Sequence, residues 1–294
     1  MACIAFIGLG NMGLPMAVNL IKAGHRIEGV DVNPTSVEKL KTAGGASAET
    51  HQIAAACADT VITMLPAGQQ VREVYLGAGG IIANAKPGTL LIDCSTIDVD
   101  TARAVAAEAE KKGLLMLDAP VSGGVGGATA ATLTFMVGGS AQAFTRAQSI
   151  LEKMGKTIVH AGGAGNGQAA KICNNMILGV SMIAVSEAFV LAEKLGLDHQ
   201  KLFDISSKSS GQCWSMTTYC PVPGPVPASP ANRDYAAGFT AAMMLKDLKL
   251  AQSAAKAAGA KTQLGADAER IYSAYVESGE AGRDFSGIIR FVRG

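Results

Sequence analysis

The first thirty residues carry the feature that most limits how this chain can fold. CIAFIGLGNMGLPMAVNLIKAGH runs from an apolar strand into Gly8, Gly10 and Gly13, and then into a helix that ends near Gly24. In this spacing the first glycine permits a tight turn, the second lets the backbone approach a pyrophosphate, and the third allows close helix packing. The N–H groups and the dipole at the start of the helix favour a bound phosphate. The order strand, turn, helix predicts a dinucleotide-binding unit.

An acidic residue ends the next expected strand, RIEGVD, at Asp31. A carboxylate roughly 20 residues beyond the glycines accepts hydrogen bonds from the adenosine ribose and repels a 2′-phosphate, which favours NAD over NADP. The alternative is a structural role only, with Asp31 opening the turn before Asn33. We predict an NAD site formed by Asp31 and the loop residues Gly8, Leu9, Gly10, Asn11, Met12 and Gly13.

Strands and helices continue to alternate beyond this unit. Apolar strands are expected at residues 60–66, 89–96 and 114–124, with helices from Gln69 and from about Asp98 to Lys112. This is the pattern of a doubly wound sheet, in which ligands collect at the carboxyl ends of the strands. We therefore expect four residues to line the cofactor crevice, although an ordinary loop role also fits them: Leu65, Pro66, Ser95 and Thr96.

The pattern changes to helix near Gly163. At 294 residues the chain is long for one domain. We predict a dinucleotide-binding domain over residues 1–163 and an all-helical substrate and oligomerisation domain over residues 164–294. The predicted fold is thus an α/β Rossmann-type doubly wound sheet domain followed by an all-α domain, joined by a long helix.

That long helix opens with GNGQAAKICNNMILGV and places Lys171 and Asn175 one turn apart on one face. A lysine is seldom fully buried unless it is paired, and burial lowers its pKa toward values useful for proton transfer. On its own, Lys171 fits a lysine that reaches solvent at a domain joint. The Asn175 partner and the position at the start of the second domain favour a catalytic role.

Composition limits the classes of partner. The 25 basic and 24 acidic residues give a net charge of +1 without a basic run, which argues against nucleic acid and anionic membranes. The six cysteines form no C-x-x-C pair, which indicates reduced thiols and no metal site. The apolar stretch at 174–196 contains polar residues and is expected to be a buried helix rather than a membrane span. We expect a cytoplasmic protein that binds small polar ligands.

Four motifs, in order and across essentially the whole chain, resemble the β-hydroxyacid dehydrogenase family: GLGNMGLPMAVNL, DAPVSGGVGGATAATLTFMVGG, GNGQAAKICNN, and KDLKLA from Lys246. The resemblance implies NAD-linked oxidation of a hydroxy acid, with Lys171 as the proton-transfer residue. It implies that Ser122, Gly123, Gly124 and Asn175 hold the substrate, and that Lys246 lies near the nicotinamide. We also assign Phe239 to the cofactor site and expect a homo-oligomer, either a dimer or a tetramer.

The glycines of the second motif divide into two groups. Gly123 and Gly124 would expose consecutive backbone N–H groups to a substrate carboxylate, and the Ser122 hydroxyl would add a donor. The later glycines need no ligand, because turns that flank the strand TLTFMV suffice to explain them. This structural group consists of Gly126, Gly127, Gly138 and Gly139.

The run from Cys213 to Phe239 resembles 3-hydroxyisobutyrate dehydrogenases of valine breakdown, which implies methylmalonate semialdehyde as the product. Trp214 could contact the substrate methyl group or fill the helical core. Relatives that act on serine, tartronate semialdehyde, or glyoxylate and succinic semialdehyde share the core motifs and are the main alternatives. A non-catalytic nucleotide-binding interaction protein would keep the glycine loop but lose Lys171.

Overall fold

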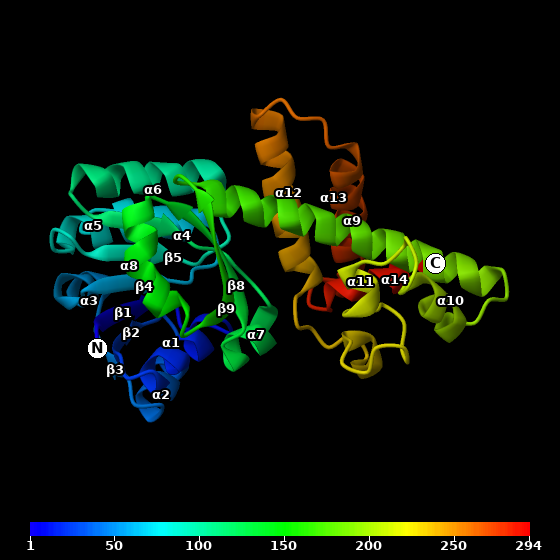
Figure 1. The fold of residues 1–294 in the computed structure, drawn as a ribbon, viewed down its shortest axis with the longest axis horizontal. Helices are drawn as coiled ribbons and strands as arrows, with labels where there is room; N and C mark the ends of the chain where they lie inside the picture. The colour runs from blue at the N-terminus through cyan, green and yellow to red at the C-terminus, as the bar shows by residue number, and fades with distance from the viewer. The chain divides into compact units, whose positions relative to one another are not determined.

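The computed structural model describes residues 1–294, which divide into two compact units: unit 1, Met1–Lys171, and unit 2, Ile172–Gly294. Figure 1 shows a layered sheet with helices in unit 1 and helices with irregular segments in unit 2. One helix, α9 (Asn166–Lys194), crosses the boundary. The units are therefore joined inside a helix and not by a loop.

Unit 1 is built on a nine-stranded sheet. Its strands are β1 (Cys3–Ile7), β2 (Arg26–Val30), β3 (Ala46–Ser47), β4 (Thr60–Thr63), β5 (Leu90–Asp93), β6 (Leu115–Asp118), β7 (Val121–Ser122), β8 (Leu133–Gly139) and β9 (Gly155–Gly162). The order is β3-β2-β1-β4-β5-β6-β8-β7, with β9 paired to β8. The strands from β3 to β6 are parallel, whereas β8 is antiparallel to β6 and β7. Winding reverses between β1 and β4, the place where such sheets bind ligands.

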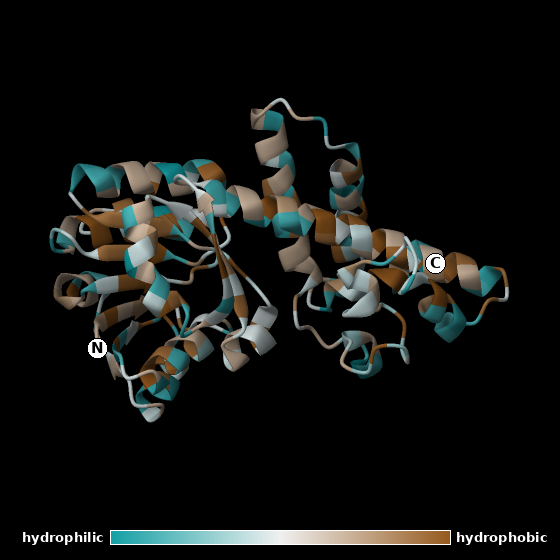
Figure 2. Cartoon of the chain, viewed as in Figure 1, coloured by the Kyte–Doolittle hydropathy of each residue, from teal (hydrophilic) through white to brown (hydrophobic).

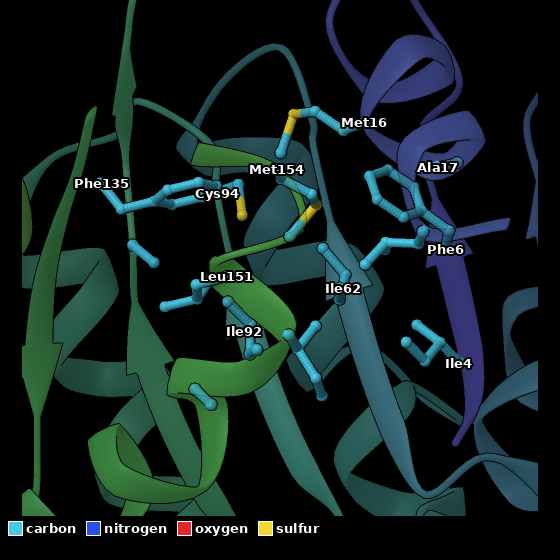
Figure 3. Packing of buried hydrophobic residues seen from close by; sticks show 14 of the residues in the cluster. Ile4, Phe6, Met16, Ala17, Ile62, Ile92, Cys94, Phe135, Leu151 and Met154 are labelled. Carbon is cyan, nitrogen blue, oxygen red and sulfur yellow. The ribbon is translucent and has the colours of Figure 1, made fainter. Parts of the chain in front are cut away.

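Helices cover both faces of this sheet. They are α1 (Gly13–Lys22), α2 (Pro34–Thr42), α3 (His51–Cys57), α4 (Gly68–Leu76), α5 (Ile81–Asn84), α6 (Val99–Lys111), α7 (Gly124–Ala130) and α8 (Ala141–Leu151). Ile4 and Phe6 of β1 join a core with Leu151 on one face (Figure 3), while Ala5 and Ile7 face a second core on the other. The strands are largely hydrophobic and the helices mixed, as Figure 2 shows. The predicted doubly wound domain is confirmed.

Two details of the middle motif differ from expectation. The strand expected at residues 114–124 is two strands, β6 and β7, because Pro120 has no N–H to continue a ladder. Gly126 and Gly127 lie inside α7 and not in a turn. The prediction of turn glycines was wrong for both.

Gly138 and Gly139 also lie in regular structure, as the last two residues of β8. Only Gly139 has a positive φ, of 141°. A Cβ on Gly138 would lie 2.5 Å from Asp118 Oδ1 and 2.6 Å from the Gly167 nitrogen. Gly138 is thus required by the close approach of α9 to the sheet, and the turn role predicted for it was wrong.

Unit 2 is helical, as predicted. Beyond α9 it contains α10 (His199–Ser206), α11 (Trp214–Thr217), α12 (Ala241–Ala257), α13 (Gln263–Tyr275) and α14 (Ile288–Arg293), with short helical turns at Pro230–Arg233, Val276–Glu280 and Phe285–Gly287. Met182 of α9 packs in a core with Met244 and Leu248 of α12. A Cβ on Gly179 would lie 3.0 Å from the Leu248 side chain, so this glycine lets the two helices pack closely.

The apolar helix α9 is only partly buried. By length and composition alone it could cross a membrane, with a mean hydropathy of 1.8 over a window that is 44% buried within the chain. Phe189 is fully buried, whereas Ile177 is 67% exposed. The prediction of a buried helix therefore holds for one side of α9 and is wrong for the other.

The start of α9 is attached to the end of β6 by Asp118. Its Oδ1 accepts a hydrogen bond from the Gly165 N–H (2.7 Å), and its Oδ2 accepts one from the Gln168 N–H (2.8 Å). Burial raises the pKa of Asp118 to about 6, although these two N–H donors oppose the shift. Both oxygens of a buried carboxylate thus hold the first turn of the helix.

This carboxylate should leave a mark on the pH dependence of stability. The pKa of Asp118 is about 6 when folded and about 3.9 when unfolded, so the folded chain binds the extra proton between these values. The stabilisation present below about pH 4 is lost as the pH rises to 6, by up to about 3 kcal/mol. The free energy of unfolding in urea should be measured from pH 4 to 7 for wild type and for Asp118→Asn. The wild-type value minus the variant value should fall by this amount as the pH rises. Asp93 is present in both proteins, so its own titration contributes to both free energies of unfolding. A difference between the two proteins that stays constant with pH would contradict the assignment.

Candidate active site

The loop between β1 and α1 has the geometry that its glycine spacing predicts. Gly8 has a φ of 94°, and a Cβ there would collide with the carbonyl oxygen of Met64. A Cβ on Gly13 would collide with the carbonyl oxygen of Gly8, so only glycine lets α1 approach this closely. Gly10 has no neighbouring atom within 4 Å of its Cβ position. The loop therefore presents open backbone at the one position where a pyrophosphate needs it.

Asp31 ties the end of β2 to this loop. Its Oδ2 accepts a hydrogen bond from the Leu9 N–H (2.5 Å), and its Oδ1 accepts one from the Asn33 N–H (2.7 Å). The turn role and a ribose role are compatible, because each carboxylate oxygen can accept a second hydrogen bond. A groove of about 530 Å³ lies here, lined by Gly10, Asn11 and Asn33 among others. Open backbone, a carboxylate and a groove fit the requirements of NAD.

The carboxyl ends of β4 and β5 are joined by a buried hydrogen-bond network. The Leu65 N–H donates to Ser95 Oγ (2.8 Å), and Ser95 Oγ donates to Asp93 Oδ1 (2.5 Å). Thr63 Oγ1 donates to the same Asp93 oxygen (2.7 Å). Burial raises the pKa of Asp93 against these donors. The predicted residues Leu65 and Ser95 are thus brought together, while Pro66 is exposed.

The expected substrate loop begins where β7 ends. Ser122 is half-buried, and Gly123 is exposed with a φ of 134°. Gly124 opens α7 with a φ of 61°. Both glycines have backbone conformations that L-residues rarely adopt, so a side chain at either position would strain the loop.

Lys171 lies in the second turn of α9 and is 7% exposed. Gln168, which is fully buried and one turn before it, accepts a hydrogen bond from the Ile97 N–H (3.0 Å) on Oε1. Its Nε2 donates to the Ser95 carbonyl oxygen (2.8 Å). Gln168 therefore hydrogen-bonds to the residues on either side of Thr96 in the sequence. The structure brings the predicted catalytic lysine and the predicted cofactor residue Thr96 to neighbouring segments of unit 1.

In unit 2, Asp247 connects two predicted residues. The Asn175 amide donates to Asp247 Oδ2 (2.5 Å), and Lys246 Nζ lies 3.3 Å from Asp247 Oδ1. Asn175 and Asp247 are both buried. The sequence analysis missed Asp247, although its place directly after Lys246 in KDLKLA could have revealed it.

The other two residues predicted in unit 2 belong to an aromatic group. Trp214 stacks on Tyr219 with ring centroids 4.9 Å apart, and Tyr219 stacks on Phe285. Phe239 meets Phe285 edge to face. Trp214 is 48% exposed, so the alternative that it fills the helical core was wrong. Its contact with a substrate stays a prediction.

A buried acid organises this aromatic group. Asp284 Oδ2 accepts hydrogen bonds from the Tyr219 hydroxyl (3.0 Å), the Gly238 N–H (2.9 Å) and the Phe239 N–H (3.2 Å). Burial, followed by the Asp284 charge, raises the pKa of Tyr219. The sequence analysis missed Tyr219 and Asp284, because no motif marks residues that are so far apart along the chain.

Comparisons with known proteins identify the family of the chain. Residues 3–163 match the family model of the NAD binding domain of 6-phosphogluconate dehydrogenase. Residues 165–292 match the model described as NAD-binding of NADP-dependent 3-hydroxyisobutyrate dehydrogenase. Together the two models cover nearly the whole chain.

Individual relatives point the same way. A probable 3-hydroxyisobutyrate dehydrogenase of Mycobacterium tuberculosis is 53% identical over 100% of this chain and 98% of the relative. The NAD-dependent L-serine dehydrogenase of Pseudomonas aeruginosa is 48% identical over 96% of this chain and 95% of its own. A solved structure of the Mycobacterium tuberculosis 3-hydroxyisobutyrate dehydrogenase with L-serine matches with a TM-score of 0.96 and 53% identity, over 100% of both chains. The chain therefore belongs to the 3-hydroxyisobutyrate dehydrogenase family and is an NAD-dependent oxidoreductase.

Proposed function

We propose that this enzyme oxidises 3-hydroxyisobutyrate to methylmalonate semialdehyde, a step of valine breakdown, with Lys171 as the general acid and base. The observation that carries the proposal is the nearly complete burial of Lys171 at the start of α9, one helical turn after Gln168, whose side chain hydrogen-bonds to Ser95 and Ile97. The names of the relatives at about 50% identity support this substrate.

The proposed reaction divides between the cofactor and the chain. Bound NAD supplies the acceptor for the hydride that leaves the substrate carbon. The neutral amine of Lys171 accepts the hydroxyl proton as the carbonyl forms, so one proton and one hydride leave the substrate. The substrate carboxylate accepts hydrogen bonds from the Ser122 hydroxyl and from the backbone N–H groups of Gly123 and Gly124. Asn175 orients the substrate hydroxyl. Asp247 accepts from the Asn175 amide (2.5 Å), which limits how that amide can turn.

L-Serine is the second candidate substrate. The relative that is 48% identical is named an NAD-dependent L-serine dehydrogenase. Serine shares with 3-hydroxyisobutyrate a carboxylate and a primary hydroxyl and differs in carrying an amino group where the other has a methyl. The predicted contact of the half-exposed, apolar Trp214 ring with the substrate would favour the methyl group over the amino group.

A substrate panel and a lysine variant test the proposal together. With NAD, kcat/KM should be higher for 3-hydroxyisobutyrate than for L-serine, glycerate or 4-hydroxybutyrate. Lys171→Ala should lower kcat about 10²- to 10⁴-fold, as expected for the loss of a general base. The affinity for NAD, measured by titration, should change little. Lys171→Arg should not restore turnover, because a guanidinium keeps its proton near neutral pH.

Two outcomes would contradict it in different ways. A preference for L-serine would replace the substrate and leave the role of Lys171 intact. An unchanged kcat in Lys171→Ala would remove Lys171 from the chemistry, whichever substrate is preferred.

The second prediction concerns cofactor choice. Asp31→Asn removes the charge that repels a 2′-phosphate and keeps one acceptor for the Leu9 or Asn33 N–H. The ratio of kcat/KM for NAD to that for NADP should therefore fall. Glu28→Gln, on the same strand β2, removes a carboxylate of equal charge and should leave the ratio unchanged. An equal fall in both variants would indicate a general effect of charge.

The third prediction concerns the substrate loop. Ser122→Ala should weaken substrate binding by about 1 to 3 kcal/mol if the hydroxyl donates to the carboxylate, and KM should rise accordingly. The melting temperature and the affinity for NAD should stay near those of the wild type. Ser149→Ala, on the exposed side of α8, is the matched control. A rise in KM with both variants, or with neither, would refute the role of Ser122.

A further inference from the structure

Two buried side chains that meet at the start of α9 have no role in the proposed chemistry: Asp118, at the end of β6, and Gln168, in the first turn of α9. Asp118 accepts the N–H groups of Gly165 (2.7 Å) and Gln168 (2.8 Å), one on each oxygen. Gln168 then uses its amide oxygen and its amide nitrogen to grip Ile97 (3.0 Å) and Ser95 (2.8 Å). The first turn of α9 is thus hydrogen-bonded to the carboxyl ends of two neighbouring strands, β6 and β5.

Glycines bring the backbone close enough for these bonds. A Cβ on Gly167 would lie 2.5 Å from the Asp118 carbonyl oxygen and 2.8 Å from its Oδ2. A Cβ on Gly138 would lie 2.5 Å from Asp118 Oδ1. The first turn therefore rests directly on the sheet, with no side chain between them that could adjust its position.

The positions fixed in this way belong to the proposed reaction. Lys171 follows Gln168 by one helical turn, so the helix transmits the placement of Gln168 to Lys171. Thr96 lies between the two residues that Gln168 grips. Ser122 is the second residue of β7, which begins after a two-residue link from Asp118. A displacement of about 1 Å at a reacting group can cost roughly 100-fold in rate.

We propose that Asp118 and Gln168 are positioning residues that set where Lys171 stands relative to Thr96 and to the Ser122–Gly124 loop. The proposal rests on the proposed function, because it takes Lys171 as the proton-transfer group. It goes further by assigning the position of Lys171 to a clamp, which consists of the two hydrogen bonds accepted by Asp118 and the two made by the Gln168 side chain. Neither clamp residue is among those proposed to bind the substrate or NAD.

Gln168 offers the sharpest test, because its side chain contributes one donor and one acceptor to the clamp. Gln168→Met keeps the approximate size and removes both bonds. Gln168→Glu keeps the acceptor, and regains a donor only when the carboxyl is protonated, which burial favours. Both variants should lower kcat by about 10- to 100-fold near pH 8. The affinity for NAD should stay near that of the wild type, because the glycine loop and Asp31 are untouched.

The pH profile separates positioning from simple loss of structure. The ratio of kcat in Gln168→Glu to that in wild type should rise as the pH falls from 8 to 5.5, and the ratio for Gln168→Met should not. The titratable groups beside Gln168 are Asp93 on β5, Asp118 on β6 and Lys171 on α9. All three are present in every variant, so Gln168→Met reports the pH dependence that they cause without a carboxyl at position 168. Gln142→Glu, exposed on α8, adds the same charge elsewhere and should keep wild-type kcat at every pH.

Hydrogen exchange supplies a readout that does not depend on turnover. Amides at the start of α9, including that of Lys171, should exchange faster in Gln168→Met, while those of β1 keep wild-type protection. If kcat in both Gln168 variants stays within about twofold of wild type, which is well below the effect of a misplaced group, the positioning role is refuted. An equal loss of NAD affinity, melting temperature and kcat, without the pH-dependent recovery, refutes it as well.

Failure of the proposed function would look different. It would appear as a wild-type enzyme that oxidises none of the hydroxy acids, or as a Lys171→Ala variant that keeps its kcat. Failure of the clamp would appear in the Gln168 variants alone, with wild type active and Lys171→Ala inactive.

Discussion

The structure depends above all on a buried carboxylate that accepts two backbone N–H groups where a strand meets a helix. Asp118 ends β6, and its two oxygens receive the Gly165 and Gln168 N–H groups at the start of α9. Burial of a charged group is costly unless hydrogen bonds compensate for it, and the raised pKa of Asp118 shows that the compensation is incomplete. This cost falls at the start of the helix that carries Lys171. An apolar residue at position 118 would leave the Gly165 and Gln168 N–H groups without these acceptors.

Much of unit 1 could be predicted because its constraints are local. Gly8, Gly10 and Gly13 have roles that follow from their spacing, and each role agrees with the space around the residue. The expected helix from Asp98 to Lys112 is confirmed as α6 with these two residues as its caps. Strand and helix periodicity, turn chemistry and capping residues all act over a few positions, so the sequence displays them directly.

The errors share a different cause. Gly138 was assigned to a turn because its neighbours in sequence suggested one. Any side chain at this position would instead collide with Asp118 and Gly167, which lie far from it along the chain. Asp284 was missed for the same reason, because it acts on residues more than forty positions away and no spacing rule marks it. Asp247 also accepts a bond from a distant residue, Asn175, but its place beside Lys246 in KDLKLA was a local signal that was overlooked. Trp214 was left between two roles, and only its exposure removed one of them.

The path of α9 through the boundary between the units limits how a chain of this kind can change in length. Domains joined by a loop tolerate insertions and deletions at the joint, since the loop absorbs them. Here Lys171 closes one unit and Ile172 opens the next within a single helix. One residue inserted between Lys171 and Asn175 would turn the rest of the helix by about 100° and advance it by about 1.5 Å, which separates the two side chains onto different faces. Substitutions in either unit are therefore compatible with the shared helix, whereas an insertion or deletion in α9 at the boundary is not.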